Sequence, residues 1–557
     1  MGFTSACAAM DMERSVSVVT YRPRKGGFVV VLATRQSGEL TLVGRGADGA
    51  DSEAEGSEEL RGNLALVSEV LRYANNEHAY RRSRSPEKRQ HHRQTADRAL
   101  RSCVALADMI DCVGDRETKG WCSGCFKNTS HVHVRGHDRP RRKYLCRVCG
   151  SATTKCAVPG CPHLALVKPT SVLTLRYCAE HRHEINAFEK LDSRLSTLDD
   201  AETWLSFRTA NAKRVTVVAG GTLAATAVVA PLAFLAAPAV GAALGGSALG
   251  GSLTGAAATS HGLAMLGGGS IAAGGLGMVG GTAVVTATGA ALGGVLGGVA
   301  TSAYVSADPS FRIEQLREGK GPPVVLASGF LTEKDDGWGL WRPMIDARFP
   351  HSPVYRVHWG AKELRALGAF VVSGVGKVAL RRMVTTAAKR GSRSFGTLPG
   401  IGAVFAARDL AANPWTVAKN RAGMTGAILA DLVARTDESP VVLVGHSLGA
   451  RVMVSAAQIL GTRGSDPLIQ EMHLLGAAVG RKGEWHSLDR AVSGTTWNYF
   501  SANDSVLRYL YTFAELGEQA VGRTGFRTSY AAIKDRSATR QVKGHSGYFE
   551  GFRLVTG

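Results

Sequence analysis

Cysteine is scarce in this sequence, and its N-terminus lacks the pattern of a secretory leader. Ten cysteines in 557 residues are too few for a disulfide-stapled secreted protein, and seven of them crowd between Cys122 and Cys178. No basic segment leads into an apolar run at the start, so we expect no secretory signal and a reducing cytosolic environment. Gly2 stands at a myristoylation position, but Ala6 replaces the Ser or Thr of that motif.

Charged side chains are missing from a long central stretch. The 93 residues from Val215 to Ala307 contain no Asp, Glu, Lys or Arg and are rich in Gly and Ala. A membrane helix needs about 20 apolar residues, so the stretch has room for about two to four crossings with close helix packing. Arg208, Lys213 and Arg214 favour a cytosolic flank before it, and an even number of crossings would return the following domain to the cytosol. The alternative is a water-excluded helical core of a soluble protein.

Basic residues exceed acidic ones and give a net charge of +20, which suits anionic surfaces such as phospholipid headgroups or nucleic acid. Many of them gather between Arg81 and Arg101, next to His91 and His92. We interpret this run as a solvated helix face or loop, with an anionic-lipid or nucleic-acid surface as the alternative. Nucleic acid is not the favoured partner.

The length leaves room for roughly three or four domains, and composition divides the chain into four regions. Residues 1–115 are expected to be a small α+β region, with a hairpin of strands 16–21 and 27–33 and a helix over 60–80. Residues 116–190 form a metal-binding module, and 191–310 a Gly/Ala-rich, membrane-associated helical region. Residues 311–557 are predicted to be an α/β-hydrolase domain with a helical insertion over 361–438, which would act as a cap or a membrane-facing lid.

Two sets of zinc ligands follow one another in the second region. Two C-x-x-C knuckles supply the first set, and the second combines three cysteines with one histidine. The predicted ligands are Cys122, Cys125, Cys146 and Cys149 for one ion, and Cys156, Cys161, Cys178 and His181 for the other. His163 and His183 compete with His181 as the fourth ligand of the second set. Four protein ligands leave no open position for water, so we expect two structural zinc ions and no catalytic metal.

A nucleophile motif lies in the fourth region. The apolar run 440–444 leads into Gly445-His446-Ser447-Leu448-Gly449 and then into a helix-forming stretch. A serine on a strained strand-to-helix turn needs neighbours without side chains, which explains the two glycines. Ser447 is therefore the predicted nucleophile.

The partners of a nucleophilic serine should follow it along the chain in the order acid, then histidine. Asp504 follows the strand-like run 496–501, and His545 follows 540–544, which we expect to be a final strand. Asp489 is the alternative acid, although no strand pattern precedes it. The predicted oxyanion donors are the backbone N–H groups of Leu448 and Phe330.

From about residue 208 to the C-terminus, the sequence resembles the transmembrane and coiled-coil domain protein 4 family. The matching stretches are HGLAMLGGGSIAAGGLGMVGG, VYRVHWGAKEL, NPWTVAKNRAGMTGAILADLVAR, PVVLVGHSLGARV and FSANDSVLRYLY. The resemblance implies a lipase-like α/β hydrolase in which Ser447, Asp504 and His545 form the triad. It does not extend to the zinc-ligand region or to the arginine-rich N-terminus.

The sequence therefore predicts a membrane-associated serine hydrolase acting on carboxylic esters, with lipid esters as the expected substrates, and with its hydrolase domain and zinc module facing the cytoplasm. The alternative is a membrane-anchored scaffold or effector with a catalytically inactive hydrolase fold. In that case the zinc module would recruit a protein partner.

Overall fold

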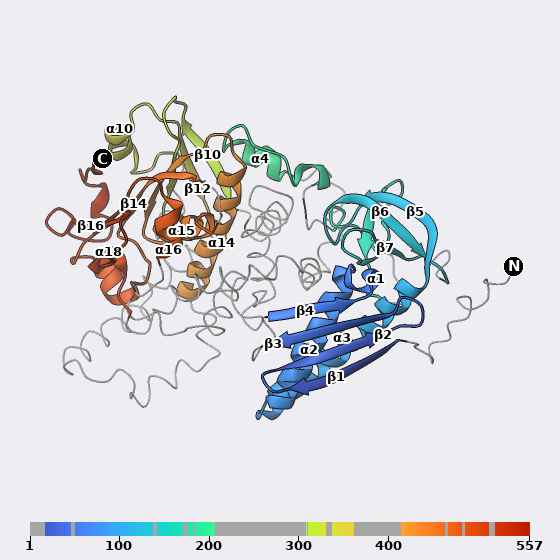
Figure 1. The fold of residues 1–557 in the computed structure, drawn as a ribbon. Helices are drawn as coiled ribbons and strands as arrows, with labels where there is room; N and C mark the ends of the chain where they lie inside the picture. Colours follow the sequence, from blue (N-terminus) through green and yellow to red (C-terminus); the bar gives the residue numbers. More distant parts are fainter. Residues whose placement is uncertain are drawn as a thin grey trace. The chain divides into compact units, whose positions relative to one another are not determined.

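The chain is described from a computed structural model. It defines residues 17–45, 51–136, 142–170, 176–182, 185, 187–206, 308, 310–329, 337–360, 414–462, 466–481, 485–511 and 518–556. These residues form two compact units, the first ending by Arg182 and the second beginning at Ile185 (Figure 1).

The first unit opens with a four-stranded antiparallel sheet in the order β1-β2-β3-β4, packed on a pair of helices. Its elements are β1 (Val18–Arg24), β2 (Gly27–Ala33), β3 (Glu39–Arg45), β4 (Asp51–Gly56), α1 (Glu58–Arg61), α2 (Leu64–Arg82) and α3 (Pro86–Asp111). Alternate residues of β2, Phe28, Val30 and Leu32, face the helices and are fully buried. The β1–β2 hairpin that the sequence predicts is present, and its turn consists of Lys25 and Gly26, with Gly26 at φ +82°.

A five-stranded antiparallel sheet completes the first unit. It contains β5 (Val113–Trp121), β6 (Asn128–Val134), β7 (Tyr144–Cys146), β8 (Ala152–Lys155) and β9 (Leu164–Leu166), in that order. Val134, Leu145 and Ala152 of this sheet belong to the same apolar core as α2 and α3. The predicted region 1–115 therefore shares one core with the part of region 116–190 that ends by Arg182, whereas residues from Ile185 onward belong to the second unit.

The second unit is built on a seven-stranded, mostly parallel sheet in the order β10-β12-β11-β13-β14-β15-β16. Its strands are β10 (Arg312–Arg317), β11 (Val324–Ala327), β12 (Val354–His358), β13 (Val441–His446), β14 (Ile469–Leu475), β15 (Thr496–Phe500) and β16 (Ile533–Ser537). Only β10, at one edge, runs antiparallel to its neighbour. The second unit is thus a mixed α/β structure.

Both faces of this sheet are covered, which is why its central strands are continuous apolar runs. Val324 and Leu326 of β11 pack with α10 (Arg342–Arg348), whereas Val325 and Ala327 belong to the core under α14 (Pro414–Arg435) and α15 (Leu448–Leu460). Along the chain, the short helix α16 (His486–Ala491) connects β14 to β15, and the short helix α18 (Val521–Thr524) lies between β15 and β16.

Helix α14 lies within the range 361–438, which the sequence predicts to be a helical insertion. Its buried residues, Ala422, Leu429 and Val433 among them, belong to the core of the sheet, so α14 is a regular covering helix. The remaining part of the predicted insertion, 361–413, lies outside the described residues.

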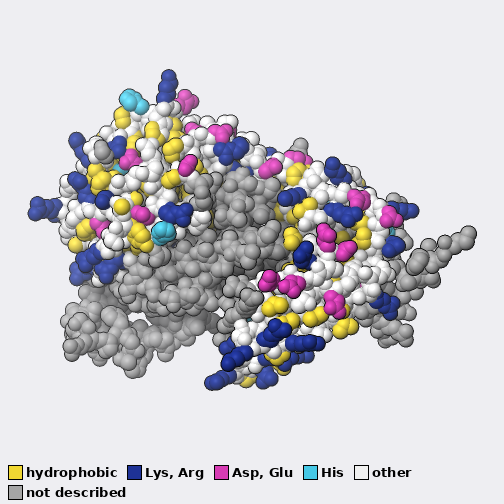
Figure 2. Space-filling view, in the orientation of Figure 1, with side chains coloured by type: hydrophobic (Ala, Val, Ile, Leu, Met, Phe, Trp, Pro, Cys, Tyr) yellow, Lys and Arg dark blue, Asp and Glu magenta, His cyan; other side chains and the backbone are white. Residues whose placement is uncertain are grey.

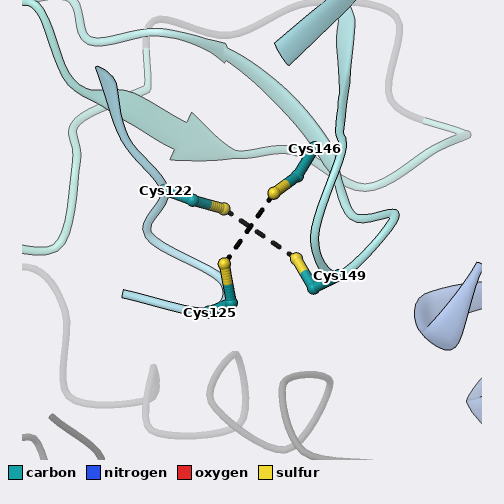
Figure 3. A group of neighbouring side chains, drawn as sticks. All are labelled: Cys122, Cys125, Cys146 and Cys149. Atoms are coloured by element: carbon teal, nitrogen blue, oxygen red, sulfur yellow. Dashed lines mark hydrogen bonds between the residues drawn. The ribbon is translucent and has the colours of Figure 1, made fainter. Parts of the chain in front are cut away.

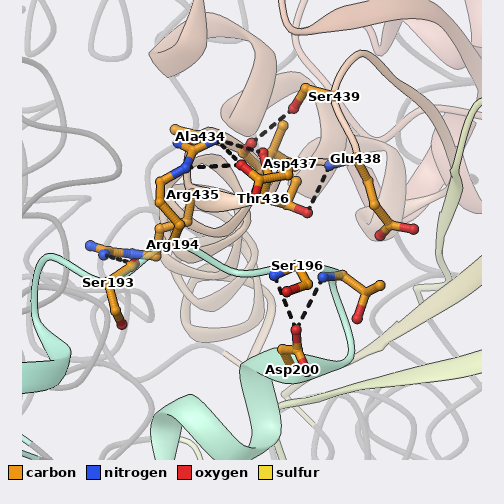
Figure 4. A network of polar contacts seen from close by, with 12 residues as sticks. Ser193, Arg194, Ser196, Asp200, Ala434, Arg435, Thr436, Asp437, Glu438 and Ser439 are labelled. Carbon is orange, nitrogen blue, oxygen red and sulfur yellow. Dashed lines mark hydrogen bonds and ion pairs between the residues drawn. The ribbon is translucent and has the colours of Figure 1, made fainter.

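A segment before the uncharged stretch folds as part of the second unit. Residues 187–206 include α4 (Asp200–Leu205) and bring Leu195, Leu198 and Trp204 into the α/β core. Figure 4 shows how this segment meets the C-terminal end of α14. The domain boundary that the sequence suggested at residue 311 leaves this segment out.

Polar contacts fix this junction (Figure 4). Arg194 donates hydrogen bonds to the carbonyl of Ala434 at 2.8 Å and to Asp437 at 2.7 Å. The backbone N–H of Leu198 donates to Glu438 at 3.0 Å. The buried Arg435 guanidinium lies 4.5 Å from the centre of the Trp204 ring.

Two local expectations differ from the structure, and one element was not predicted. Residues 540–544 form no strand. The last strand of the described sheet is β16, which the sequence did not reveal because its residues Ile-Lys-Asp-Arg-Ser are mostly exposed at the sheet edge and carry no apolar signal. The acidic segment 51–56, for which the sequence predicts no element, forms β4, since pairing with β3 overrides its low strand propensity. The helix expected over 60–80 is interrupted at Gly62, and α2 starts where the Asn63 side chain accepts from the N–H of Leu66.

In the described part of the chain, no helix combines the length and apolarity that a membrane crossing requires. The uncharged stretch 215–307, where the sequence predicts membrane helices, lies outside the described residues.

From the contacts between residues 187–206 and α14, we predict that Trp204 stabilises the second unit although it lies far from the sheet in sequence. Trp204→Ala should lower the free energy of unfolding by about 3 to 5 kcal/mol, because a large buried side chain is lost. Denaturant unfolding of the full chain followed by circular dichroism measures this change. Glu202→Ala, on the exposed side of α4, is the matched control and should have little effect. Equal stability of the two variants would contradict the packing described.

Candidate active site and metal centres

The candidate active site lies where the chain reverses its direction of travel across the sheet. From β11 the chain adds β12 on one side and then returns to add β13 on the other. Such a switch point leaves a crevice at the carboxyl ends of the strands, where open α/β sheets bind their ligands. The residues at these ends are Ser328 and Gly329 after β11 and Ser447 after β13.

Ser447 occupies a strained turn between β13 and α15. Its φ of 59° and ψ of −122° are rarely adopted by residues with a side chain. A Cβ on Gly445 would come within 2.6 Å of the Cα of Ala450, and one on Gly449 within 2.1 Å of the Ala327 carbonyl oxygen. Side chains at these two positions would clash with backbone, so the turn requires both glycines of the motif.

His545 joins the serine and the acid that the sequence singles out. Its Nε2 lies 2.8 Å from the Ser447 Oγ, and its Nδ1 lies 2.7 Å from the Asp504 Oδ2. The other Asp504 oxygen accepts from the backbone N–H of Leu507 at 2.9 Å. An ionised Asp504 selects the tautomer with the proton on Nδ1, which leaves Nε2 free to accept the serine proton.

Side chains that sequence analysis did not single out hold the His545 loop in place. The ring Nε2 of His446, inside the nucleophile motif, lies 2.9 Å from the backbone carbonyl of His545. Burial lowers the pKa of His446 to about 3, so the ring is neutral at physiological pH and donates from Nε2. Ser501 Oγ and Asn503 Nδ2 bond the carbonyls of Val542 and Thr539, both at 2.8 Å. These are tertiary contacts with no local sequence signal.

The loop after β11 packs directly against the nucleophile turn. A Cβ on Gly329 would lie 2.5 Å from the backbone nitrogen of Leu448, so the two backbones are in close contact. The indole of Trp341 donates to the Ser328 Oγ at 2.8 Å, and that of Trp359 donates to the Ser328 carbonyl at 2.9 Å. Two tryptophans from different elements therefore position this loop.

The remaining predicted site residues have different outcomes. Leu448 begins α15, so its N–H belongs to the N-terminus of that helix. Phe330 lies outside the described residues. Asp489 is in α16 and accepts the backbone N–H of Ala532 at 2.9 Å, a structural contact away from His545.

Cys122, Cys125, Cys146 and Cys149 converge on one point (Figure 3). The Sγ atoms of Cys122 and Cys149 are 3.9 Å apart, and those of Cys125 and Cys146 are 3.8 Å apart. Disulfide sulfurs would be about 2.05 Å apart. Sulfurs bound at about 2.3 Å to one tetrahedral ion would be about 3.8 Å apart, which matches the observed spacing. Hydrogen bonds from the other three thiols lower the pKa of Cys146.

Cys156, Cys161, Cys178 and His181 form a second cluster. The Nδ1 of His181 lies 3.1 Å from the Cys178 Sγ and 3.6 Å from the Cys156 Sγ. The Sγ atoms of Cys161 and Cys178 are 4.0 Å apart. Of the competing ligands, His163 has its Nε2 3.8 Å from Glu180, and His183 lies outside the described residues. Both clusters therefore offer four converging ligand atoms suited to a metal ion.

Fold and site together define a mixed α/β protein with a Ser–His–Asp contact at the carboxyl edge of a mostly parallel sheet. The chain belongs to the family described as "Protein of unknown function (DUF726)", which matches residues 210–555. The match covers the α/β unit from β10 onward and does not reach the cysteine clusters.

Three relatives have comparable similarity. A rice (Oryza sativa subsp. japonica) protein named "Transmembrane and coiled-coil domain-containing protein STS1" is 28% identical over 361 residues, which cover 62% of this chain and 52% of the relative. The "Probable lipase MIL1" of Saccharomyces cerevisiae is 28% identical, with 48% and 25% covered. The "Uncharacterized membrane protein F35D11.3" of Caenorhabditis elegans is 30% identical, with 51% and 47% covered. The matches thus span about half or less of each relative. No solved structure matches this chain significantly.

The two clusters predict that the purified protein holds close to two metal ions per chain, because each cluster brings together four ligand atoms. Elemental analysis of protein prepared without chelator measures the ratio. Cys122→Ser should remove about one ion per chain, whereas Cys103→Ala, at a buried cysteine outside both clusters, should remove none. An unchanged metal content in Cys122→Ser would refute the first site.

Proposed function

We propose that the second unit is a serine hydrolase of the α/β-hydrolase type that cleaves carboxylic esters. The observation that carries the proposal is the position of His545 between Ser447 and Asp504, with hydrogen-bond distances of 2.8 Å and 2.7 Å. Serine alone is a weak nucleophile, and an imidazole that accepts its proton while held by a carboxylate is the usual means of activating it. The strained backbone at Ser447 supports the same conclusion, since such strain concentrates at catalytic residues.

In the proposed reaction, the Ser447 Oγ attacks the ester carbonyl carbon while its proton passes to Nε2 of His545. The carbonyl oxygen becomes an oxyanion, which accepts a hydrogen bond from the backbone N–H of Leu448. His545 then gives the proton to the departing alkoxide, so an alcohol leaves and an acyl-enzyme remains. Water attacks this ester by the same route and releases the carboxylic acid and free Ser447.

The loop after β11 would supply the second oxyanion donor. Gly329 contacts the backbone of Leu448, so the N–H of the next residue, Phe330, is the proposed donor. The indole hydrogen bonds to Ser328 would hold this loop rigid while charge develops on the oxyanion.

Lipid esters are the proposed substrate class, and a membrane the proposed location. The yeast relative named as a probable lipase supports the substrate, and relatives named as membrane proteins support the location. The uncharged stretch 215–307 is the proposed membrane contact, with the zinc module and the hydrolase unit facing the cytoplasm. We also propose that, within its family, the chain is a relative of the transmembrane and coiled-coil domain protein 4 group that its sequence resembles.

Zinc is the proposed ion of both clusters, since three or four thiolates in a tetrahedral arrangement favour it. Each cluster would then be a closed structural site, and the ester chemistry would need no metal. The predicted role is to hold the strands of the first unit together.

A fluorophosphonate probe tests the catalytic proposal. Because labelling needs an activated serine, the wild-type protein should be labelled at Ser447 and Ser447→Ala should not. Ser455→Ala, a buried serine on the following helix, is the control and should keep the label. A wild-type protein that resists the probe and hydrolyses no ester would instead favour the scaffold or effector alternative.

The identity of the acid is a separate prediction. Asp504→Asn should lower kcat by about 10³- to 10⁴-fold while the fold stays intact, because the amide no longer fixes the tautomer of His545 or stabilises its protonated form. Asp489→Asn should lower it little, since that carboxylate accepts a backbone N–H in α16. Steady-state ester hydrolysis compares the two variants. If Asp489→Asn were the crippling change, the assignment of Asp504 would be wrong.

A further inference from the structure

One end of the first unit carries a dense group of exposed Lys and Arg side chains. Figure 2 shows Lys and Arg side chains gathered there, where α2 and α3 meet in Figure 1. Residues 20–27 and 77–93 contain nine Lys or Arg and two Glu. The exposed cations come from the end of β1, the turn after it, the last turn of α2, the link between α2 and α3, and the first turns of α3: Arg22, Arg24, Lys25, Arg81, Arg82, Arg84, Arg89 and Arg93. We call this set the basic end.

Contacts between the β1–β2 hairpin and the helix pair α2–α3 show that these turns lie together. The Tyr21 hydroxyl of β1 lies 3.0 Å from the Nδ1 of His78 in α2, and the Arg81 guanidinium lies 5.1 Å from the centre of the Tyr21 ring. On the α3 side, Arg89 and Arg93 lie 5.0 Å and 5.3 Å from the centre of the Tyr80 ring. The cations therefore form one surface rather than separate turns.

The neighbouring acids offset only part of this charge. Glu77 pairs with Arg81 at 2.7 Å, and Asp97 pairs with Arg93 at 3.3 Å. Arg82, Arg84 and Arg89 are exposed. Concentrating like charges destabilises a folded unit through mutual repulsion, so such a surface is expected to have an anionic partner.

We propose that the basic end binds the surface of an anionic phospholipid bilayer. Clusters of about four to eight Lys or Arg bind such membranes, each contributing about 1 kcal/mol, equivalent to about a fivefold gain in affinity. The proposal concerns the first unit, outside the family match, and does not depend on the catalytic site.

Two observations favour a bilayer over nucleic acid. The cations lie at the tips of two adjoining hairpins, a shape suited to touching a plane of headgroups, whereas groove binding requires the side of a helix or ribbon. Two half-buried tyrosines, Tyr21 and Tyr80, lie among the arginines. Tyrosine, with its apolar ring and polar hydroxyl, is enriched at the membrane interface.

The test measures binding of the full-length protein to phosphatidylcholine vesicles with and without phosphatidylserine. The ratio of the two partition coefficients isolates the electrostatic part, because apolar insertion contributes to both. Replacing Arg82, Arg84 and Arg89 together by Gln should lower this ratio by up to about 100-fold. High salt should lower the ratio for the wild type in the same direction.

A matched control removes the same charge elsewhere in the first unit, at the exposed Arg116, Lys119 and Lys127, again by Gln. The control should keep the wild-type ratio, and circular dichroism should show both triple variants folded. An equal fall in both variants, or no fall in either, would overturn the proposal. Tighter binding of a short DNA duplex than of anionic vesicles, lost only in the first variant, would overturn it in favour of nucleic acid. Hydrolysis of a soluble ester should be the same in both variants, so the catalytic proposal is tested separately.

Discussion

The close approach of two backbones controls the geometry of the α/β unit. Strands β11 and β13 pair in parallel, and the turn after β13 then passes so near β11 that Gly449 has no room for a side chain beside the Ala327 carbonyl. This contact fixes the direction of α15 and brings the N–H of Leu448 beside Gly329. The strain at Ser447 persists because β13 is packed on both faces of the sheet and α15 is packed against one of them.

The sequence predicts those parts of the site that local rules determine. A strand-to-helix turn needs its glycines at fixed positions, so the sequence singles out Ser447 as the candidate nucleophile, and Asp504 follows a strand with an apolar signal. The prediction of His545 rests on a strand over 540–544 that the structure does not contain; the strand before it is β16, a polar edge strand without an apolar signal. The roles of His446, Trp341 and Trp359 depend on which loops meet in the folded chain, and no spacing along the sequence reports that.

In the first unit, the cysteine spacing predicts both clusters, whereas the way they join the helices could not be predicted. Ala65 at the start of α2 donates its N–H to the carbonyl of Cys149, and Asn63 bonds the carbonyl of Gly150. The first turn of α2 is therefore built on the second knuckle of the four-cysteine cluster. Since both parts also share one apolar core, ligand geometry and helix packing are coupled, and an ion bound there would stabilise more than its own loops.

The junction between residues 187–206 and α14 gives the second unit an unusual kind of continuity. Residues up to Ser206 and residues from Asp308 onward both contribute to this unit, and the Asp308 carboxylate accepts the N–H of Gly360. A single backbone cut between these points would leave two polypeptides joined by the Arg194 hydrogen bonds and the packing of Trp204. The described part of the unit is in effect assembled from two separate segments of the sequence, which recognise each other through the surfaces around Arg194 and Trp204.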